Sequence, residues 1–252
     1  MPPAPDVPDA DPAQPDPPDP ALDPDHAGDQ AMHRLRVMSY NVKMLKLDQA
    51  AAAEVVRAAA PDVLGLQEPP LGPRKRRRLE EFAARAGLRV AVSGHGARTT
   101  ALLVAPGVTV GEARAHRLPW HVGRTRRGFV VAQVDGITVV VLHLALESAE
   151  RLDHVEAILG ELALITGPCV VVGDLNEVPG GPTWGRLTGG LRDAVDPPQP
   201  TFTANRPRRR LDAVLVSPEV RVHGSDVPAG PTTRRASDHL PIVVDLTVIE
   251  AH

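Results

Sequence analysis

Short apolar runs, rich in Val, Leu and Ile, recur along the chain from residue 35 onward, and segments with helical spacing separate several of them. Runs of roughly four to eight such residues, bounded by Gly or Pro, are typical of strands. Many of the runs lack strict apolar–polar alternation, so the sheets that they form should be covered on their faces. The runs occupy residues 35–40, 62–66, 88–92, 101–104, 129–134, 137–142, 169–173, 211–216 and 241–248. Strands that alternate with helices in this way predict a layered α/β domain.

Three helices are expected between these strands. Asp48 can cap an Ala-rich segment that Pro61 stops. A second helix should span residues 74–86 and end at Gly87. A third should follow Ser148, because apolar residues recur there at helical spacing.

Residues 1–33 have a composition of their own, with ten Pro, eight Asp and no Lys or Arg. Such a segment cannot bury enough apolar surface to offset the entropy of ordering, which predicts a disordered tail before a domain of residues 34–252. The chain has a formal net charge of −3, and removing the eight Asp leaves about +5 on the domain. A mildly basic domain suits an anionic substrate.

The N-terminus shows no basic region followed by an apolar one, and no stretch of 18 or more apolar residues occurs. We therefore expect no transmembrane segment, and a cytoplasmic protein. The single cysteine, Cys169, opens an apolar run and is expected to be a buried strand residue. With one cysteine no intrachain disulfide can form, which fits a reducing compartment. We expect a monomer.

Polar side chains follow several of the predicted strands at the point where each strand ends. A rigid strand can aim such groups at one place. Six motifs of this kind occur in the chain: Tyr40-Asn41, Gln67-Glu68, His143-Leu144, Gly173-Asp174-Leu175-Asn176, Leu211-Asp212 and Ser237-Asp238-His239.

In this order the six motifs resemble the endonuclease/exonuclease/phosphatase superfamily, which includes deoxyribonuclease I, abasic-site endonucleases, neutral sphingomyelinases, inositol-polyphosphate 5-phosphatases and deadenylases. The resemblance runs from about Leu35 to Leu246. It implies an α/β four-layer sandwich, in which two mixed sheets pack face to face with helices outside. It also implies phosphoester hydrolysis at a site where loops from both sheets converge at one edge.

Carboxylate and amide oxygens are the hard ligands that Mg²⁺ prefers. We therefore expect Asn41 and Glu68 to bind Mg²⁺, for which Mn²⁺ can substitute, and the resemblance gives Asp238 a role at the same metal site. By itself, Glu68 could equally be a solvated loop residue before Pro69 and Pro70.

Asp174 and Asn176 lie two residues apart, so on an extended segment they would point to the same side. The resemblance implies that Asp174 positions or deprotonates the attacking water and that Asn176 donates a hydrogen bond to the nucleophile or to a phosphoryl oxygen. The alternative is an Asx turn after a buried strand.

The resemblance gives His239 a role in proton transfer or in polarising the phosphate, with Asp212 holding its imidazole. Alternatively, Asp212 could pair with an arginine of 208–210. The resemblance also implies that His143 stabilises the charged phosphoryl group, although a lone histidine after an apolar strand is more often structural.

The motifs describe phosphoester chemistry and leave the substrate open. An endonuclease or exonuclease is one expectation, with nucleic acid as a possible partner. The alternative is a phosphatase or phosphodiesterase on a phospholipid headgroup or small phosphorylated metabolite, and a silent phospholigand-binding protein is a third. Three Phe, two Trp and one Tyr leave few platforms for unpaired bases, and we expect Trp120 and Trp184 in loops.

The basic clusters are less specific than the motifs. Residues 74–78 are expected to form a solvated face. The better-placed phosphate contacts are Arg124, Arg126 and Arg127, or Arg206 and Arg208 to Arg210.

Overall fold

The computed structural model describes Met1 and residues 34–248, so the rest of the predicted tail (2–33) and the last four residues lie outside the described part. The strands are β1 (Arg34–Asn41), β2 (Val63–Gln67), β3 (Arg89–Ser93), β4 (Thr100–Val104), β5 (Val110–Arg117), β6 (Gly128–Val134), β7 (Ile137–His143), β8 (Cys169–Asp174), β9 (Arg192–Asp193), β10 (Asp212–Val216), β11 (Val220–Asp226) and β12 (Ile242–Val248). The helices are α1 (Gln49–Ala59), α2 (Lys75–Ala86), α3 (Ser148–Leu162), α4 (Pro182–Leu187) and α5 (Pro231–Ala236).

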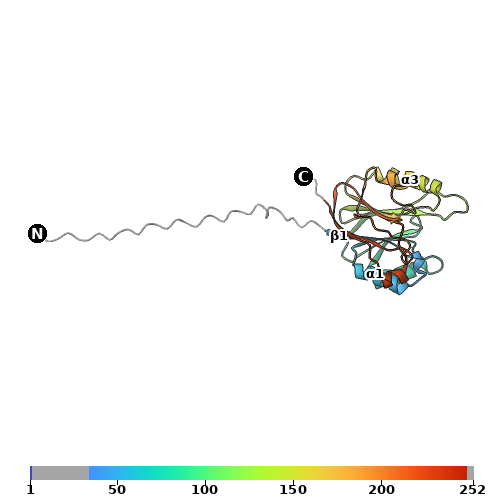
Figure 1. Cartoon of the computed structure of the whole chain (residues 1–252), viewed down its shortest axis with the longest axis horizontal. Helices are drawn as coiled ribbons and strands as arrows, with labels where there is room; N and C mark the ends of the chain where they lie inside the picture. The colour runs from blue at the N-terminus through green and yellow to red at the C-terminus, as the bar shows by residue number, and fades with distance from the viewer. Residues whose placement is uncertain (2–33, 249–252) are drawn as a thin grey trace. The chain divides into compact units, whose positions relative to one another are not determined.

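The strands form two six-stranded sheets. The first has the order β11-β12-β1-β2-β4-β3, and the second has the order β5-β6-β7-β8-β10-β9. Each sheet contains one parallel pair, β1 with β2 and β7 with β8, among antiparallel ones. Helix α3 lies on one side of the two sheets and α1 on the other (Figure 1). The predicted four-layer α/β sandwich of two mixed sheets is therefore confirmed.

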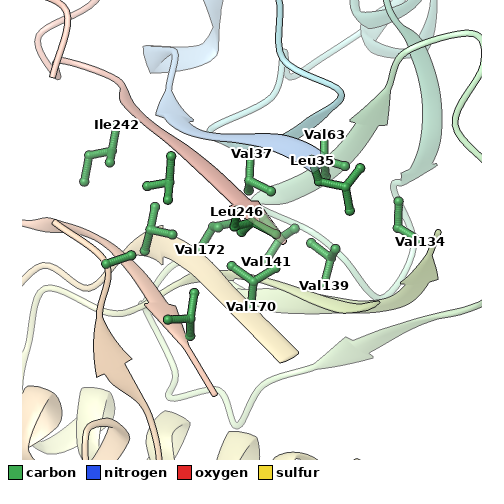
Figure 2. Packing of buried hydrophobic residues seen from close by; sticks show 14 of the residues in the cluster. Leu35, Val37, Val63, Val134, Val139, Val141, Val170, Val172, Ile242 and Leu246 are labelled. Atoms are coloured by element: carbon green, nitrogen blue, oxygen red, sulfur yellow. The ribbon is translucent and has the colours of Figure 1, made fainter. Parts of the chain in front are cut away.

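Three apolar clusters correspond to the three junctions between the layers. The largest lies between the sheets, where side chains such as Val37 and Val63 meet Val141 and Val172 (Figure 2). A second cluster lies between the first sheet and α1 and α2, and a third lies between the second sheet and α3 and α4. The inner strands are thus covered on both faces, which explains their continuous apolar sequences.

Gly65 in β2 lets the two sheets approach each other closely. A Cβ atom built there would lie 2.2 Å from Cγ2 of Val172, on the facing strand β8. Any larger residue would therefore have to push the sheets apart or move that valine.

The three predicted helices are confirmed as α1, α2 and α3. The Asp48 side chain accepts a hydrogen bond from Ala51 N–H at 2.9 Å and so caps α1. Gly87 ends α2 with a φ of 79°. As expected, α2 presents a solvated basic face, on which Arg76 and Arg77 pair with glutamates one turn later.

The sequence patterns missed β5 and β11, which lie at the edges of the two sheets. Most of their side chains are half-buried or exposed, so neither strand has an apolar run. The two-residue edge strand β9 and the short helices α4 and α5 were also missed. The expected loop position of Trp184 is wrong, because this residue lies in α4 and is buried. Trp120 does lie outside the helices and strands, and it is exposed. No helix in the described residues is both long and apolar enough to span a membrane.

Candidate active site

Three of the predicted site residues lie side by side in the second sheet. His143 ends β7 and is paired in register with Asp174, which ends β8. Asp174 is in turn paired with Asp212, the first residue of β10. All three side chains are buried. The register of three neighbouring strands therefore places an imidazole and two carboxylates in one row.

The first sheet contributes Asn41 and Glu68. Asn41 ends β1 beside Gln67 of β2, and Glu68 follows that strand. The Asn41 amide Nδ2 donates to Asp174 Oδ2 at 3.0 Å and lies 3.4 Å from Glu68 Oε1. The Asn41 side chain thus joins the two sheets at the edge where both sets of motifs end.

His239 is bound to Asp212, with 2.9 Å between Nδ1 and Oδ2. Burial by itself would lower the pKa of His239, but the carboxylates of Asp212, Asp174 and Asp238 raise it to about 9. The alternative partner for Asp212 is not observed. Instead, the buried Arg210 binds Asp193 through two hydrogen bonds of 2.6 Å.

Asp174 Oδ2 lies at the centre of the site. It is 3.7 Å from Nε2 of His143 and 3.7 Å from Nε2 of His239, in addition to its bond from Asn41. Burial and the Asp212 carboxylate raise the pKa of Asp174 to about 6, although His239 and hydrogen bonds from Asn176 and Asn41 oppose this shift. A raised pKa makes this carboxylate a stronger proton acceptor than an ordinary aspartate.

Asn176 does not lie on an extended segment, so the expectation that it points to the same side as Asp174 is wrong. Its φ is 51°, and its N–H donates to Asp174 Oδ1 at 2.9 Å, which makes an Asx turn. Its amide Nδ2 donates to the carbonyl of Leu144 at 2.8 Å. The side chain of Asn176 thereby ties the loop after β8 to the end of β7.

The two histidines differ in charge. Burial lowers the pKa of His143 well below its usual value, and the positive charges of Arg127 and His239 lower it further. His143 is consequently neutral at pH 7, whereas His239 is an imidazolium.

Asp238 forms an ion pair that its sequence did not indicate. Its Oδ2 lies 2.7 Å from the ammonium Nζ of Lys43. Lys43 begins a turn of three residues, 43–45, that all have positive φ, and Asn41 Oδ1 accepts a hydrogen bond from its N–H at 3.0 Å. Non-glycine residues in this conformation are strained, and such strain is often found at functional sites.

Arg127 is a buried arginine on the β7 side of the site. It is 8 % exposed, and its Nη1 lies 3.4 Å from the carbonyl of His143. Burial lowers the pKa of Arg127, and the charges of Asp174 and Glu68 oppose this shift. Of the arginines named as alternatives, Arg124 pairs with Glu147 and Arg126 lies over the Trp120 ring.

The donor set suits a hard divalent ion. Asp174, Asp212 and His239 each offer a ligand atom, and these atoms lie within 4.8 Å of one another. Asp212 Oδ1 is buried and accepts no hydrogen bond from any residue that the structure describes. Because Asp212 holds His239 as an imidazolium, the oxygens of this cluster are better ligands than its nitrogen.

Asn41 and Glu68 lie beside this cluster, where Asn41 Nδ2 donates to Asp174 Oδ2 and lies 3.4 Å from Glu68 Oε1. Asp238 is the least suited of the three predicted ligands, because Lys43 already neutralises its charge. The prediction of Asn41, Glu68 and Asp238 did not include Asp174 and Asp212, whose motifs were assigned to the chemistry alone.

Sequence reasoning missed Lys43 completely and left Arg127 as one of several candidates. Lys43 could have been found from its position two residues after Asn41. Arg127 could have been singled out by its position directly before the apolar run of β6. A chain with 25 Arg residues and three Lys offers little contrast for picking out one arginine.

A buried row of carboxylates and imidazoles at one edge of a two-sheet sandwich defines a hydrolase-like site. The sequence model of the Endonuclease/Exonuclease/phosphatase family matches residues 38–239, and the chain belongs to this family. Members of the family are phosphoester hydrolases, and they typically bind a divalent metal ion. A search of curated proteins found no match.

Solved structures of the same fold come from several bacteria. An endonuclease/exonuclease/phosphatase from Bacteroides vulgatus has a TM-score of 0.73 at 17% identity, covering 86% of this chain and 99% of the other. One from Beutenbergia cavernae has a TM-score of 0.66 at 26% identity, covering 85% and 72%. A mannosyl-6-phosphatase from Bacteroides thetaiotaomicron has a TM-score of 0.68 at 17% identity, covering 84% and 99%.

Proposed function

We propose that this protein hydrolyses a phosphoester bond with the help of a divalent cation, for which Mg²⁺ is the expected ion and Mn²⁺ a substitute. The observation that supports this most strongly is the row of His143, Asp174 and Asp212, with His239 bound to Asp212. A phosphoester resists attack because its negative charge repels nucleophiles, so an enzyme must neutralise that charge and position a nucleophile.

The residues divide these tasks by charge. His239, held as an imidazolium by Asp212, can stabilise a phosphoryl oxygen or give a proton to the leaving group. Asp174, whose pKa is raised by burial and by the Asp212 carboxylate, can orient water and accept its proton. The neutral His143 and the buried Arg127 lie on the β7 side and can contact the remaining phosphoryl oxygens.

The cation would be held by Asn41, Glu68 and the carboxylates of Asp174 and Asp212, with Asp238 available if Lys43 moves. When bound there, it would neutralise charge on the phosphate. The site is rich in buried carboxylate, which a cation would offset. This supports a metal-dependent reaction and weighs against a silent phospholigand-binding protein.

Two more specific phosphoester hydrolase activities are compatible with this site. A nuclease would have to hold its substrate through the backbone, because Trp120 is the one exposed Trp, Tyr or Phe in residues 34–248. The alternative is a phosphatase or phosphodiesterase that acts on a phospholipid headgroup or a small phosphorylated metabolite. The mannosyl-6-phosphatase that shares the fold makes a small phosphorylated substrate a reasonable member of any assay panel.

A panel of plasmid DNA, RNA, inositol phosphates, sphingomyelin and bis-p-nitrophenyl phosphate tests this proposal. We expect turnover of at least one substrate with Mg²⁺ or Mn²⁺ and none with excess EDTA. Glu68→Ala should raise the Mg²⁺ concentration that gives half-maximal activity. Full turnover in metal-free buffer would refute the metal requirement, and unchanged metal dependence in Glu68→Ala would remove Glu68 from the ligand set.

A further inference from the structure

A small open cavity lies on the segment whose Phe202 packs against His239, and it is not used in the chemistry described above. It has a volume of about 280 Å³, and its lining consists of Phe202, Thr203, Arg206, Arg208 and Arg209. The Phe202 ring lies between this cavity and the active site, with its centroid 4.8 Å from the centroid of the His239 ring. A ligand in the cavity would therefore lie about one aromatic ring away from the imidazolium.

The segment that lines the cavity is fixed to the active site by its backbone. Phe202 forms β-bridges with both Arg209 and His239. The N–H of Ala204 donates to the carbonyl of Asp238 at 2.7 Å, and the N–H of Leu240 donates to the carbonyl of Thr201 at 2.8 Å. Because these bonds anchor the segment on both sides of His239, its position relative to the imidazole is set before any ligand arrives.

The charge in this cavity is not compensated. Arg206, Arg208 and Arg209 are exposed, and within residues 34–248 none of the three has a carboxylate at ion-pair distance. Arg209 lies over the Phe202 ring at 5.0 Å. The next residue, Arg210, differs from them because Asp193 binds it.

The basic helix α2 provides a comparison within the same chain. Its arginines Arg76 and Arg77 are exposed too, but each pairs with a glutamate four residues later. The three arginines beside His239 have no such partner, and they surround a cavity rather than a convex helix face. Exposure to solvent and pairing with glutamates therefore explain the arginines of α2, but they do not explain the three unpaired arginines around the cavity.

We propose that Phe202, Arg206, Arg208 and Arg209 form a subsite that binds a second phosphate group of the substrate, next to the phosphoester that is hydrolysed at His239. Guanidinium groups bind phosphate through paired hydrogen bonds, and three of them around one cavity match a negatively charged phosphate group. The inference rests on the proposed function and specifies its substrate class as molecules with at least two phosphates. Both a nucleic-acid backbone and a small multiply phosphorylated metabolite offer that chemistry.

The test compares substrates with and without a second phosphate. Bis-p-nitrophenyl phosphate has one phosphate, whereas a short oligodeoxynucleotide and an inositol bisphosphate represent the two sources of a second one. The variant replaces Arg206, Arg208 and Arg209 with Gln together. A matched control replaces three exposed arginines elsewhere with Gln, namely Arg57, Arg85 and Arg221, and so makes the same change in net charge.

We expect the subsite variant to lower the ratio of kcat/KM for a two-phosphate substrate to kcat/KM for bis-p-nitrophenyl phosphate by roughly tenfold or more, because charge-assisted hydrogen bonds are lost. The loss should appear mainly in KM and should shrink at high salt. The control variant should leave both rates unchanged. The affected substrate, oligonucleotide or inositol bisphosphate, then identifies the source of the second phosphate.

An unchanged ratio in the subsite variant would overturn the inference, as would an equal fall in the control. If the wild-type protein hydrolyses bis-p-nitrophenyl phosphate but neither two-phosphate substrate, the proposed function stands and the subsite is refuted. If it hydrolyses none of the three but does hydrolyse a one-phosphate substrate of the panel such as sphingomyelin, the subsite is again refuted and the proposed function stands. Only a lack of turnover across the whole panel would refute both.

Discussion

The pairing of His239 with Asp212 keeps the His239 imidazole protonated near neutral pH, so this residue can supply a proton there. The folded-state pKa of about 9 lies above the ordinary value of 6.5. The protonated imidazole therefore contributes stability that is fully present below pH 6.5 and is lost as the pH rises through about 9. NMR titration of metal-free protein should show His239 titrating near 9, and Asp212→Asn should lower this value. A pKa near 6.5 for His239 in the wild-type protein would contradict the account. His143 should stay neutral over the pH range in which His239 titrates.

Asp212 should act on catalysis through His239 rather than independently. In that case Asp212→Asn should add little to the loss of kcat already caused by His239→Ala. Rates of the two single variants and the double variant on one substrate measure this. A double variant that lost the product of the two single effects would show that the residues do not work as a pair.

At the residue scale, the six motifs pointed to residues that the structure brings together, because polar residues at strand ends stand out against apolar runs. The ion pair of Lys43 with Asp238 could not be predicted. The ion pair depends on a left-handed turn at residues 43–45, which contains no glycine or asparagine that would indicate such a turn. It also depends on a partner 195 positions away in the sequence. The Asx turn, which is one of the two alternatives for Asp174 and Asn176, is present beside the buried site.

At the element scale, Gly65 sets how closely the two sheets approach each other. Gly65→Ala should destabilise the protein by about 1–3 kcal/mol, because its Cβ would meet Val172. Denaturant unfolding measures the change, and Val172→Ala in the same chain should recover part of it. Gly160→Ala on the exposed face of α3 is the control, and it should be neutral or slightly stabilising. Full stability of Gly65→Ala would show that the sheets are not in close contact there.

The same scale shows which strands can be recognised from sequence. The inner strands β7 and β8 are buried along their whole length and therefore appear as continuous apolar runs. The edge strands β5 and β11 contact one neighbour each and face water, so backbone pairing rather than side-chain burial defines them. Helices α4 and α5 have six residues each, too few for an apolar period to show.

At the scale of the whole molecule, the predicted tail and the expected monomer remain predictions. The composition of residues 1–33 gives that segment no means of packing. A protein that begins at His33 should keep the melting temperature and kcat of the full chain, and light scattering should give the mass of one chain for both. A lower melting temperature or kcat in the shorter protein would show that the tail supports the domain, and a dimer mass would refute the monomer.

The central claim is that the buried row of His143, Asp174 and Asp212, together with the His239 bound to it, performs the hydrolysis, and His239→Gln tests it most directly. The variant should lower kcat on the best substrate of the panel by roughly 10²- to 10⁴-fold with Mg²⁺ present, the usual scale for a proton-transfer or electrostatic group. His223→Gln replaces an exposed histidine on β11 and serves as the matched control. Near-normal kcat in a folded His239→Gln protein would contradict the account, whereas the expected loss with a normal His223→Gln would support it.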